Sequence, residues 1–199
     1  GHFHRASAGA IVWQQNNHIA VNYAIQALTG LNLPVQLCAD ITAAEYGKLL
    51  LNLNNALNAI SGLPLMQQLL DRKWRLLLAA AMQEWLHICY KAGVKPLAYT
   101  TLPNALLPWL LRLPTGLFRR AAAKMLAIDE QARSSMSDDI RSHKRTEIMF
   151  LIGAVVRMAQ LHQTTAPVNS LLVEQIKRLE NGDGALSVDE LLRQTGLRA

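Results

Sequence analysis

The residues of this sequence best placed to do chemistry lie on one side of a predicted helix. In the segment KLLLNLNN (residues 48–55), positions 48, 52 and 55 follow at i, i+4 and i+7, so Lys48, Asn52 and Asn55 share one stripe. The leucines between them predict a mostly buried helix, in which a lysine and amides are costly unless they find partners. Two interpretations stay open. The lysine either extends along the apolar surface to reach solvent, or lies in a cleft where its ammonium polarises a carbonyl and the amides hold a polar ligand.

A second polar cluster lies about eighty residues further on, in the segment SSMSDD (residues 134–139), and is followed by Thr146 and Glu147. Thr146 and Glu147 stand where an apolar helix is predicted to begin, and there a hydroxyl caps the helix and an acid favours its dipole. The serines before Met136 are equally consistent with a loop that caps a short turn at Asp138. Each feature alone therefore has a purely structural explanation.

Taken in order, the segments AEYGKLLLN, SSMSDDIRSHKRTEI, GAVVRMA and APVN resemble the C-terminal helical domain of ketopantoate reductases, which are NADP-dependent 2-dehydropantoate 2-reductases. The resemblance runs from about residue 34 to residue 180. It implies a mainly α fold, with a helical C-terminal domain of the 6-phosphogluconate dehydrogenase-like type preceded by a short α/β remnant of a Rossmann domain. The implied reaction reduces 2-dehydropantoate to pantoate in pantothenate and coenzyme A biosynthesis, and this chain supplies the substrate-binding half.

The resemblance also implies roles for individual residues. Lys48 matches the catalytic lysine that acts as general acid on the ketone oxygen, and Glu147 matches the glutamate paired with that lysine and the substrate. Asn52 and Ser135 match residues that hold the substrate, and Asn55 is a further candidate contact. A carboxylate near Lys48 would keep the ammonium charged and in place in a half-buried cleft. We therefore expect the helix that begins near Thr42 to pack against the one that begins near Arg145, with Lys48, Glu147, Asn52 and Ser135 at one cleft.

The sequence departs from the family pattern at two amide positions. Ala56 stands where the family commonly has another asparagine, and Ala132 stands where some members have one. A tryptophan is also common at the position of Tyr46. These departures affect the identity of the substrate more than the class of reaction, so a reductase of a related 2-keto acid is an alternative.

A dinucleotide-binding fingerprint G-x-G-x-x-G, which places a phosphate on a helix N-terminus, does not occur in the chain. The pair Gly182 and Gly184 follows a predicted helix and indicates a turn. We expect NADP to be bound mainly by an N-terminal domain that this sequence lacks, with no cofactor-binding residue and no metal site here. By itself the chain is then expected to be inactive.

Two alternatives come from other classes. One is a truncated, non-catalytic helical module that dimerises, although such a module has no reason to keep both Lys48 and Glu147 at the family spacing. The other is an enzyme of the wider β-hydroxyacid or 6-phosphogluconate dehydrogenase type. The Ser-Met-x-x-Asp and Thr-Glu-Ile motifs favour ketopantoate reductase over the latter.

The elements that must position these residues fall into two predicted units. Residues 1–40 contain a strand over 8–13, a helix over 17–28 and a strand over 34–38, the remnant of a nucleotide-binding domain. Residues 41–199 form the helical substrate domain. Its first helix begins with a capping box of Thr42 and Glu45 and ends at Gly62. Further helices are predicted over 74–92, 104–111, 117–128 and 145–162, from Pro167 onward, and over 189–194.

Composition excludes several classes of protein. With 199 residues, 51% of them hydrophobic and 17% charged, the chain is globular. Its charge of +6 is scattered along the sequence without a basic aromatic patch, so no nucleic acid is expected as a partner. No apolar run is long enough to span a membrane, and no secretory leader is expected. Cys38 and Cys89 are then reduced thiols of a cytoplasmic protein. The exposed strand edges of residues 1–40 make a homodimer possible.

Overall fold

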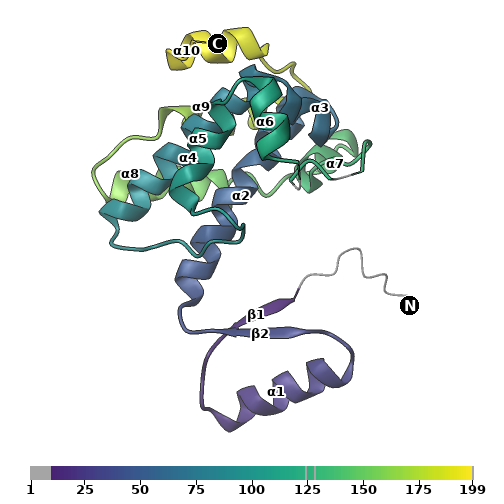
Figure 1. The fold of residues 1–199 in the computed structure, drawn as a ribbon, viewed down its shortest axis with the longest axis vertical. Helices are drawn as coiled ribbons and strands as arrows, with labels where there is room; N and C mark the ends of the chain where they lie inside the picture. Colours follow the sequence, from purple (N-terminus) through teal and green to yellow (C-terminus); the bar gives the residue numbers. More distant parts are fainter. Residues whose placement is uncertain (1–9, 124, 128, 199) are drawn as a thin grey trace.

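A computed structural model describes residues 10–198 of the chain, except for residues 124 and 128. Its first part is a strand, a helix and a strand: β1 (Ile11–Gln14), α1 (Ile19–Gly30) and β2 (Val35–Cys38). The two strands pair in parallel, with Ile11 opposite Val35 and Gln14 opposite Cys38. The start of the strand predicted over 8–13 lies outside the described residues, but the predicted order of elements is confirmed. Figure 1 shows this βαβ unit below the helices, joined to them through α2.

The other described residues cover little of the βαβ unit. Helix α1 has no buried residue, although it is rich in apolar side chains. Ile19 and Tyr23 are each 66% exposed, and Leu31 is 72% exposed. A two-stranded sheet with one uncovered apolar helix is only marginally stable alone, so this unit presents a surface suited to a partner.

After β2 the described residues contain helices and no further strand. The longer helices are α2 (Ile41–Ser61), α4 (Arg72–Lys91), α8 (Ile152–Leu161), α9 (Pro167–Glu180) and α10 (Val188–Thr195). The short ones are α3 (Leu65–Leu70), a 3₁₀ turn at Asn104–Leu106, α5 (Leu107–Arg112), α6 (Thr115–Ala121) and α7 (Ser135–Arg141). Helix α4 lies at the centre of the core and packs against α2, α5, α8, α9 and α10. The chain is mainly helical, as the sequence predicts.

Several predicted helix boundaries were wrong. Asp40, rather than Thr42, caps α2, because its carboxylate accepts a hydrogen bond of 3.0 Å from the N–H of Ala43. The helix predicted over 145–162 begins only at Ile152. The segment before it is held in another conformation, because the N–H of Thr146 donates to the Glu180 carboxylate at 2.7 Å. The helix predicted over 117–128 ends at Ala121.

One buried cation ties the short helices to α4. Arg75 is completely buried, and its guanidinium donates to the carbonyl oxygens of Leu69, Leu70, Leu111 and Leu113 at 2.8–3.0 Å. It also lies 4.3 Å from the centre of the Phe118 ring. Burial lowers the pKa of Arg75. These bonds satisfy carbonyls at helix ends, so the charge is compensated by backbone dipoles.

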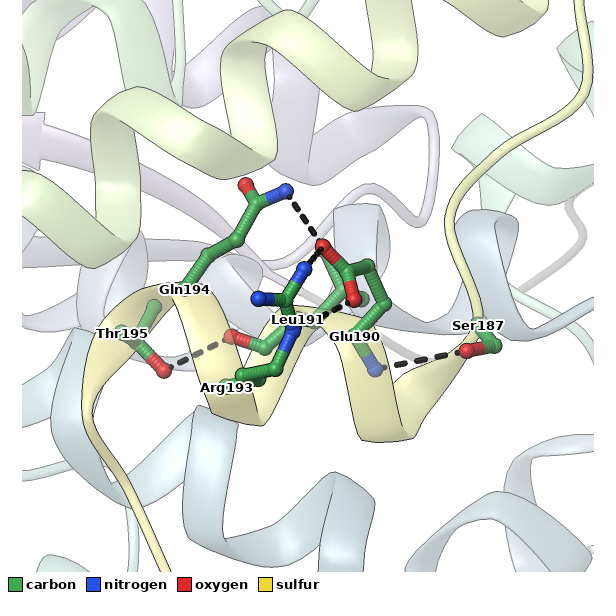
Figure 2. A network of polar contacts seen from close by, with 6 residues as sticks. All are labelled: Ser187, Glu190, Leu191, Arg193, Gln194 and Thr195. Carbon is green, nitrogen blue, oxygen red and sulfur yellow. Dashed lines mark hydrogen bonds and ion pairs between the residues drawn. The ribbon is translucent and has the colours of Figure 1, made fainter.

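The last helix, α10, is stabilised by local polar contacts along its exposed side (Figure 2). The Ser187 hydroxyl caps it by accepting from the N–H of Glu190 at 3.3 Å. Arg193 and Gln194 then donate to the Glu190 carboxylate at 2.6–2.9 Å. Leu191 and Leu192 are buried and attach the helix to the core. No helix within the described part of the chain is long and apolar enough to cross a membrane.

Candidate functional site

Lys48 and Asn52 lie at one cleft. Both residues belong to α2; Lys48 is exposed and Asn52 is half-buried. The cleft has a volume of about 340 Å³ and lies between α2 and the chain that leads into α8. Its lining residues from α2 are Glu45, Tyr46, Lys48, Leu49 and Asn52, and those from the opposite side are Phe150, Leu151 and Ala154. The lysine and amide of the predicted stripe therefore share a cavity large enough for a small molecule.

Backbone contacts on another side of α2 fix the position of Lys48. The N–H of Leu97 donates to the carbonyl oxygen of Ala43 at 2.7 Å, so the loop after α4 lies directly against α2. This approach requires a glycine next to Lys48, because a Cβ atom on Gly47 would overlap the Leu97 carbonyl oxygen. The indole N–H of Trp85 donates to the carbonyl oxygen of Tyr46 at 2.9 Å. The backbone that carries Lys48 is thus rigidly held while its side chain is not.

Glu147 precedes the cleft-lining residues Phe150 and Leu151 in the sequence but does not itself line the cleft. It is an exposed residue in the turn before α8, and among the described residues no ion pair joins it to Lys48. The N–H groups of Phe150 and Leu151 donate to the Glu147 carbonyl oxygen at 2.9 and 3.0 Å. Glu147 therefore begins the turn whose far end lines the cleft. The helix expected to begin near Arg145 begins later, at Ile152, and it contacts α2 through Met158, whose sulfur accepts a hydrogen bond from the Tyr46 hydroxyl at 3.8 Å.

Glu180, which no motif in the sequence singles out, anchors the turn that carries Glu147. Its carboxylate, at the end of α9, accepts from the N–H of Thr146 at 2.7 Å and contacts Arg145 at 3.4 Å. Burial by itself raises the pKa of Glu180, but the hydrogen bonds from Thr146 and the charge of Arg145 outweigh it and lower the pKa. Glu180 is thus an ionised group that fixes the chain at Arg145 and Thr146.

Ser135 and Asn55 are placed away from Lys48. Ser135 is the exposed first residue of α7, and it does not line the cleft. Asn55 is half-buried and lines a different cavity, of about 260 Å³, together with Asn54 and apolar residues of α3, α4 and α5. Of the five predicted site residues, the structure brings together Lys48 and Asn52.

Ser134, rather than Ser135, forms hydrogen bonds with α2. This buried residue caps α7, and its hydroxyl donates to the Asn55 carbonyl oxygen at 3.0 Å. Its N–H donates to the side-chain oxygen of Asn58 at 2.9 Å, and Asn58 in turn donates to the Leu63 carbonyl oxygen at 2.9 Å. The sequence does contain a signal for Asn58. It is an asparagine at an apolar position of a predicted buried helix, and a buried amide needs hydrogen-bond partners.

The βαβ unit does not fit the phosphates of a dinucleotide. The connection between β1 and α1, residues 15–18, has the sequence QNNH without a glycine. The imidazole of His18 caps α1 by accepting from the N–H of Ala20 at 3.2 Å, which occupies the helix end where a pyrophosphate would bind. Within residues 10–198 as described, no group of three or more His, Cys, Asp or Glu side chains could hold a metal ion.

Comparison with known families identifies the helical part. The model of the family "Ketopantoate reductase PanE/ApbA C terminal" matches residues 40–180. The chain belongs to this family. The match covers all five predicted site residues and ends at Glu180, so the resemblance inferred from the sequence is confirmed.

Similar proteins agree with this assignment. The chain is 29% identical over 135 residues to the 2-dehydropantoate 2-reductase of Vibrio cholerae, covering 64% of this chain and 46% of that protein. The crystal structure of a PanE/ApbA family ketopantoate reductase from Ralstonia eutropha is 25% identical, with a TM-score of 0.66 over 88% of this chain and 53% of the other. The structure of D-mandelate dehydrogenase with NADH and anilino(oxo)acetate has the same fold, with a TM-score of 0.65 at 18% identity over 87% of this chain and 68% of the other. The chain spans about half the length of the two reductases.

Proposed function

We propose that this chain is the substrate-binding half of an NADPH-dependent reductase that converts 2-dehydropantoate, or a closely related 2-keto acid, to the 2-hydroxy acid. The observation that carries the proposal is the cleft in which Lys48 and Asn52 lie together. Membership of the ketopantoate reductase family supports the reaction class. Lys48 provides a cation that can bind the oxygens of a 2-keto acid, and Asn52 provides an amide that can orient it.

Lys48 is proposed as the catalytic residue. Reduction of a ketone places negative charge on its oxygen, and an ammonium held at that oxygen stabilises the charge and delivers the proton. Among the described residues that line the cleft, the Nζ atom of Lys48 is the only cationic group, since the other charged residue there is Glu45. Asn52, one turn further along α2, is proposed to hold the substrate carboxylate or ketone through its amide. Glu147 and Ser135 remain proposed partners of lysine and substrate, which they would reach by side-chain or loop movement on binding.

The hydride is proposed to come from NADPH bound outside this chain. Residues 1–40 are assigned to the end of a nucleotide-binding domain and residues 41–199 to the substrate domain. The uncovered apolar face of α1 supports this division, because it fits a surface that the rest of such a domain would bury. The same face would also serve a homodimer. The free thiols Cys38 and Cys89 accord with a cytoplasmic setting.

The test is to join the chain to the nucleotide-binding half of a related reductase. We expect the chain alone to show no reduction of 2-dehydropantoate with NADPH. Fusion behind the N-terminal half of the Vibrio cholerae reductase should produce activity. In the fusion, Lys48→Ala should lower kcat/KM by about a thousandfold, which corresponds to about 4 kcal/mol of transition-state stabilisation.

A matched control is Lys91→Ala, which removes another exposed lysine, from the end of α4 outside the cleft. It should leave kcat/KM within about twofold of the parent fusion. An active fusion that tolerates Lys48→Ala as well as Lys91→Ala would show that Lys48 is only a surface lysine.

A further inference from the structure

Apart from Lys48, Asn52 and Glu45, the wall of the Lys48 cleft is mostly apolar. Tyr46 also lines it, and its hydroxyl donates to the sulfur of Met158 at 3.8 Å. Leu49 contributes to the wall from α2, and Phe150, Leu151 and Ala154 form the opposite side. None of these four side chains can donate or accept a hydrogen bond. A ligand whose polar end is held by Lys48 and Asn52 therefore places most of its remaining atoms against hydrocarbon.

Phe150 is the largest apolar side chain of this wall. Its ring is 80% exposed, although it belongs to a turn that is fixed by two hydrogen bonds to the Glu147 carbonyl. A large aromatic side chain held in water at the rim of a cavity gains free energy when an apolar group covers it. No described residue of the chain performs that role, since the ring remains this exposed.

Ala56 and Ala132 offer the cleft no alternative polar contact, and neither of them lines it. Ala56 is completely buried under the surface of α2, and Ala132 uses its carbonyl oxygen to accept from the N–H of Leu65 at 2.9 Å. A hydroxyl at the far end of the substrate would lose its hydrogen bonds to water on entering the cleft and would find few replacements.

We propose that the keto acid accepted by this chain carries an apolar side chain, branched aliphatic or aromatic, instead of the hydroxyl-bearing side chain of 2-dehydropantoate. This inference rests on the proposed function and specifies its substrate class. Lys48 and Asn52 engage the keto-acid end, and Leu49, Phe150, Leu151 and Ala154 cover the side chain.

The test measures binding of three acids to the 199-residue chain by isothermal titration and ligand-observed NMR. The acids are 4-methyl-2-oxopentanoate, phenylpyruvate and 2-dehydropantoate. We expect at least one of the two apolar acids to bind about tenfold more tightly than 2-dehydropantoate. Phe150→Ser should weaken the apolar acids about five- to tenfold, since burial of one aromatic face is lost, and should reduce their advantage over 2-dehydropantoate.

Tyr90→Ser is the matched control, because Tyr90 is an aromatic residue with the same 80% exposure and does not line the cleft. It should leave all three affinities unchanged. Tighter binding of 2-dehydropantoate would overturn the inference about the side chain and leave the proposed reductase function standing. Failure of all three acids to bind, or binding that Lys48→Met does not weaken, would overturn the proposed function together with the inference.

Discussion

Two pairs of polar side chains on α2 have opposite surroundings. Asn54 and Asn58 are bonded to Gln68, Leu63 and Ser134, and Asn58 is completely buried. Lys48 and Asn52 make no side-chain hydrogen bond or ion pair within the described chain and border a cleft instead. The first set joins α2 to α3 and α7, whereas the second is available to a ligand. Residue type alone does not distinguish an amide that stabilises the fold from one that can bind a substrate.

Gly47→Ala should have a larger effect on folding than the loss of any single polar side chain of α2. In an ordinary helix, alanine is favoured over glycine by about 1 kcal/mol. Here the new methyl group would collide with the Leu97 carbonyl oxygen, which is backbone and cannot turn away. We expect a loss of about 3 kcal/mol in the free energy of unfolding, measured by urea denaturation.

Gly153→Ala is the control for this change, because Gly153 is also a helical glycine and its nearest neighbours include the movable ends of Met149 and Arg157 at 3.3–3.4 Å. Its effect should stay within about 1 kcal/mol. Equal effects of the two substitutions would mean that the contact with Leu97 does not hold the N-terminal half of α2.

Asn58→Ala should cost about 2 to 3 kcal/mol of stability. It leaves the buried N–H of Ser134 and the Leu63 carbonyl oxygen without their partner and opens a small cavity. Asn52→Ala, the same substitution on the same helix, should change stability by less than about 0.5 kcal/mol. Thermal unfolding of the two variants tests the contrast between the two pairs of polar residues on α2 directly, and similar melting temperatures would contradict it.

Glu180→Gln should remove about 1 kcal/mol at neutral pH by weakening the hold on Thr146 and Arg145. The folded-state pKa of Glu180 lies below its ordinary value of 4.5, so its stabilising effect is present above that pH and disappears as the pH falls through the lowered pKa. The difference in unfolding free energy between the parent and Glu180→Gln should therefore shrink on acidification below about pH 4.5. A difference that grows with acidification would contradict the assigned direction.

Lys48→Ala should have the smallest effect on the fold. The side chain is exposed and unpaired among the described residues, and alanine is a good helix former. We expect the free energy of unfolding to change by less than about 0.5 kcal/mol, by the same urea measurement. A large loss of unfolding free energy would show that Lys48 stabilises the fold. Lys48 would then no longer differ from Asn54 and Asn58, and its proposed catalytic role would lose this support.

The sequence by itself determined the fold class, the strand-helix-strand order at the start, the stripe of Lys48 and Asn52, and the family. These follow from local periodicity and from motifs, which do not depend on distant contacts. The α2 and α4 helices, Pro167 at the start of α9 and the turn at Gly182 lie where their local signals predict.

Only the tertiary structure decided which polar residues meet. Glu147 was predicted to begin a helix facing Lys48, but Glu180 on α9 binds Thr146 and delays that helix to Ile152. Ser135 and Ser134 are adjacent in sequence, yet the hydrogen bonds to Asn55 and Asn58 bury Ser134 and leave Ser135 at the surface. Contacts between residues far apart in the chain have no local pattern, because they depend on how whole helices pack. The same reason explains why the apolar wall at Phe150 and the need for a glycine beside Leu97 became apparent only in three dimensions.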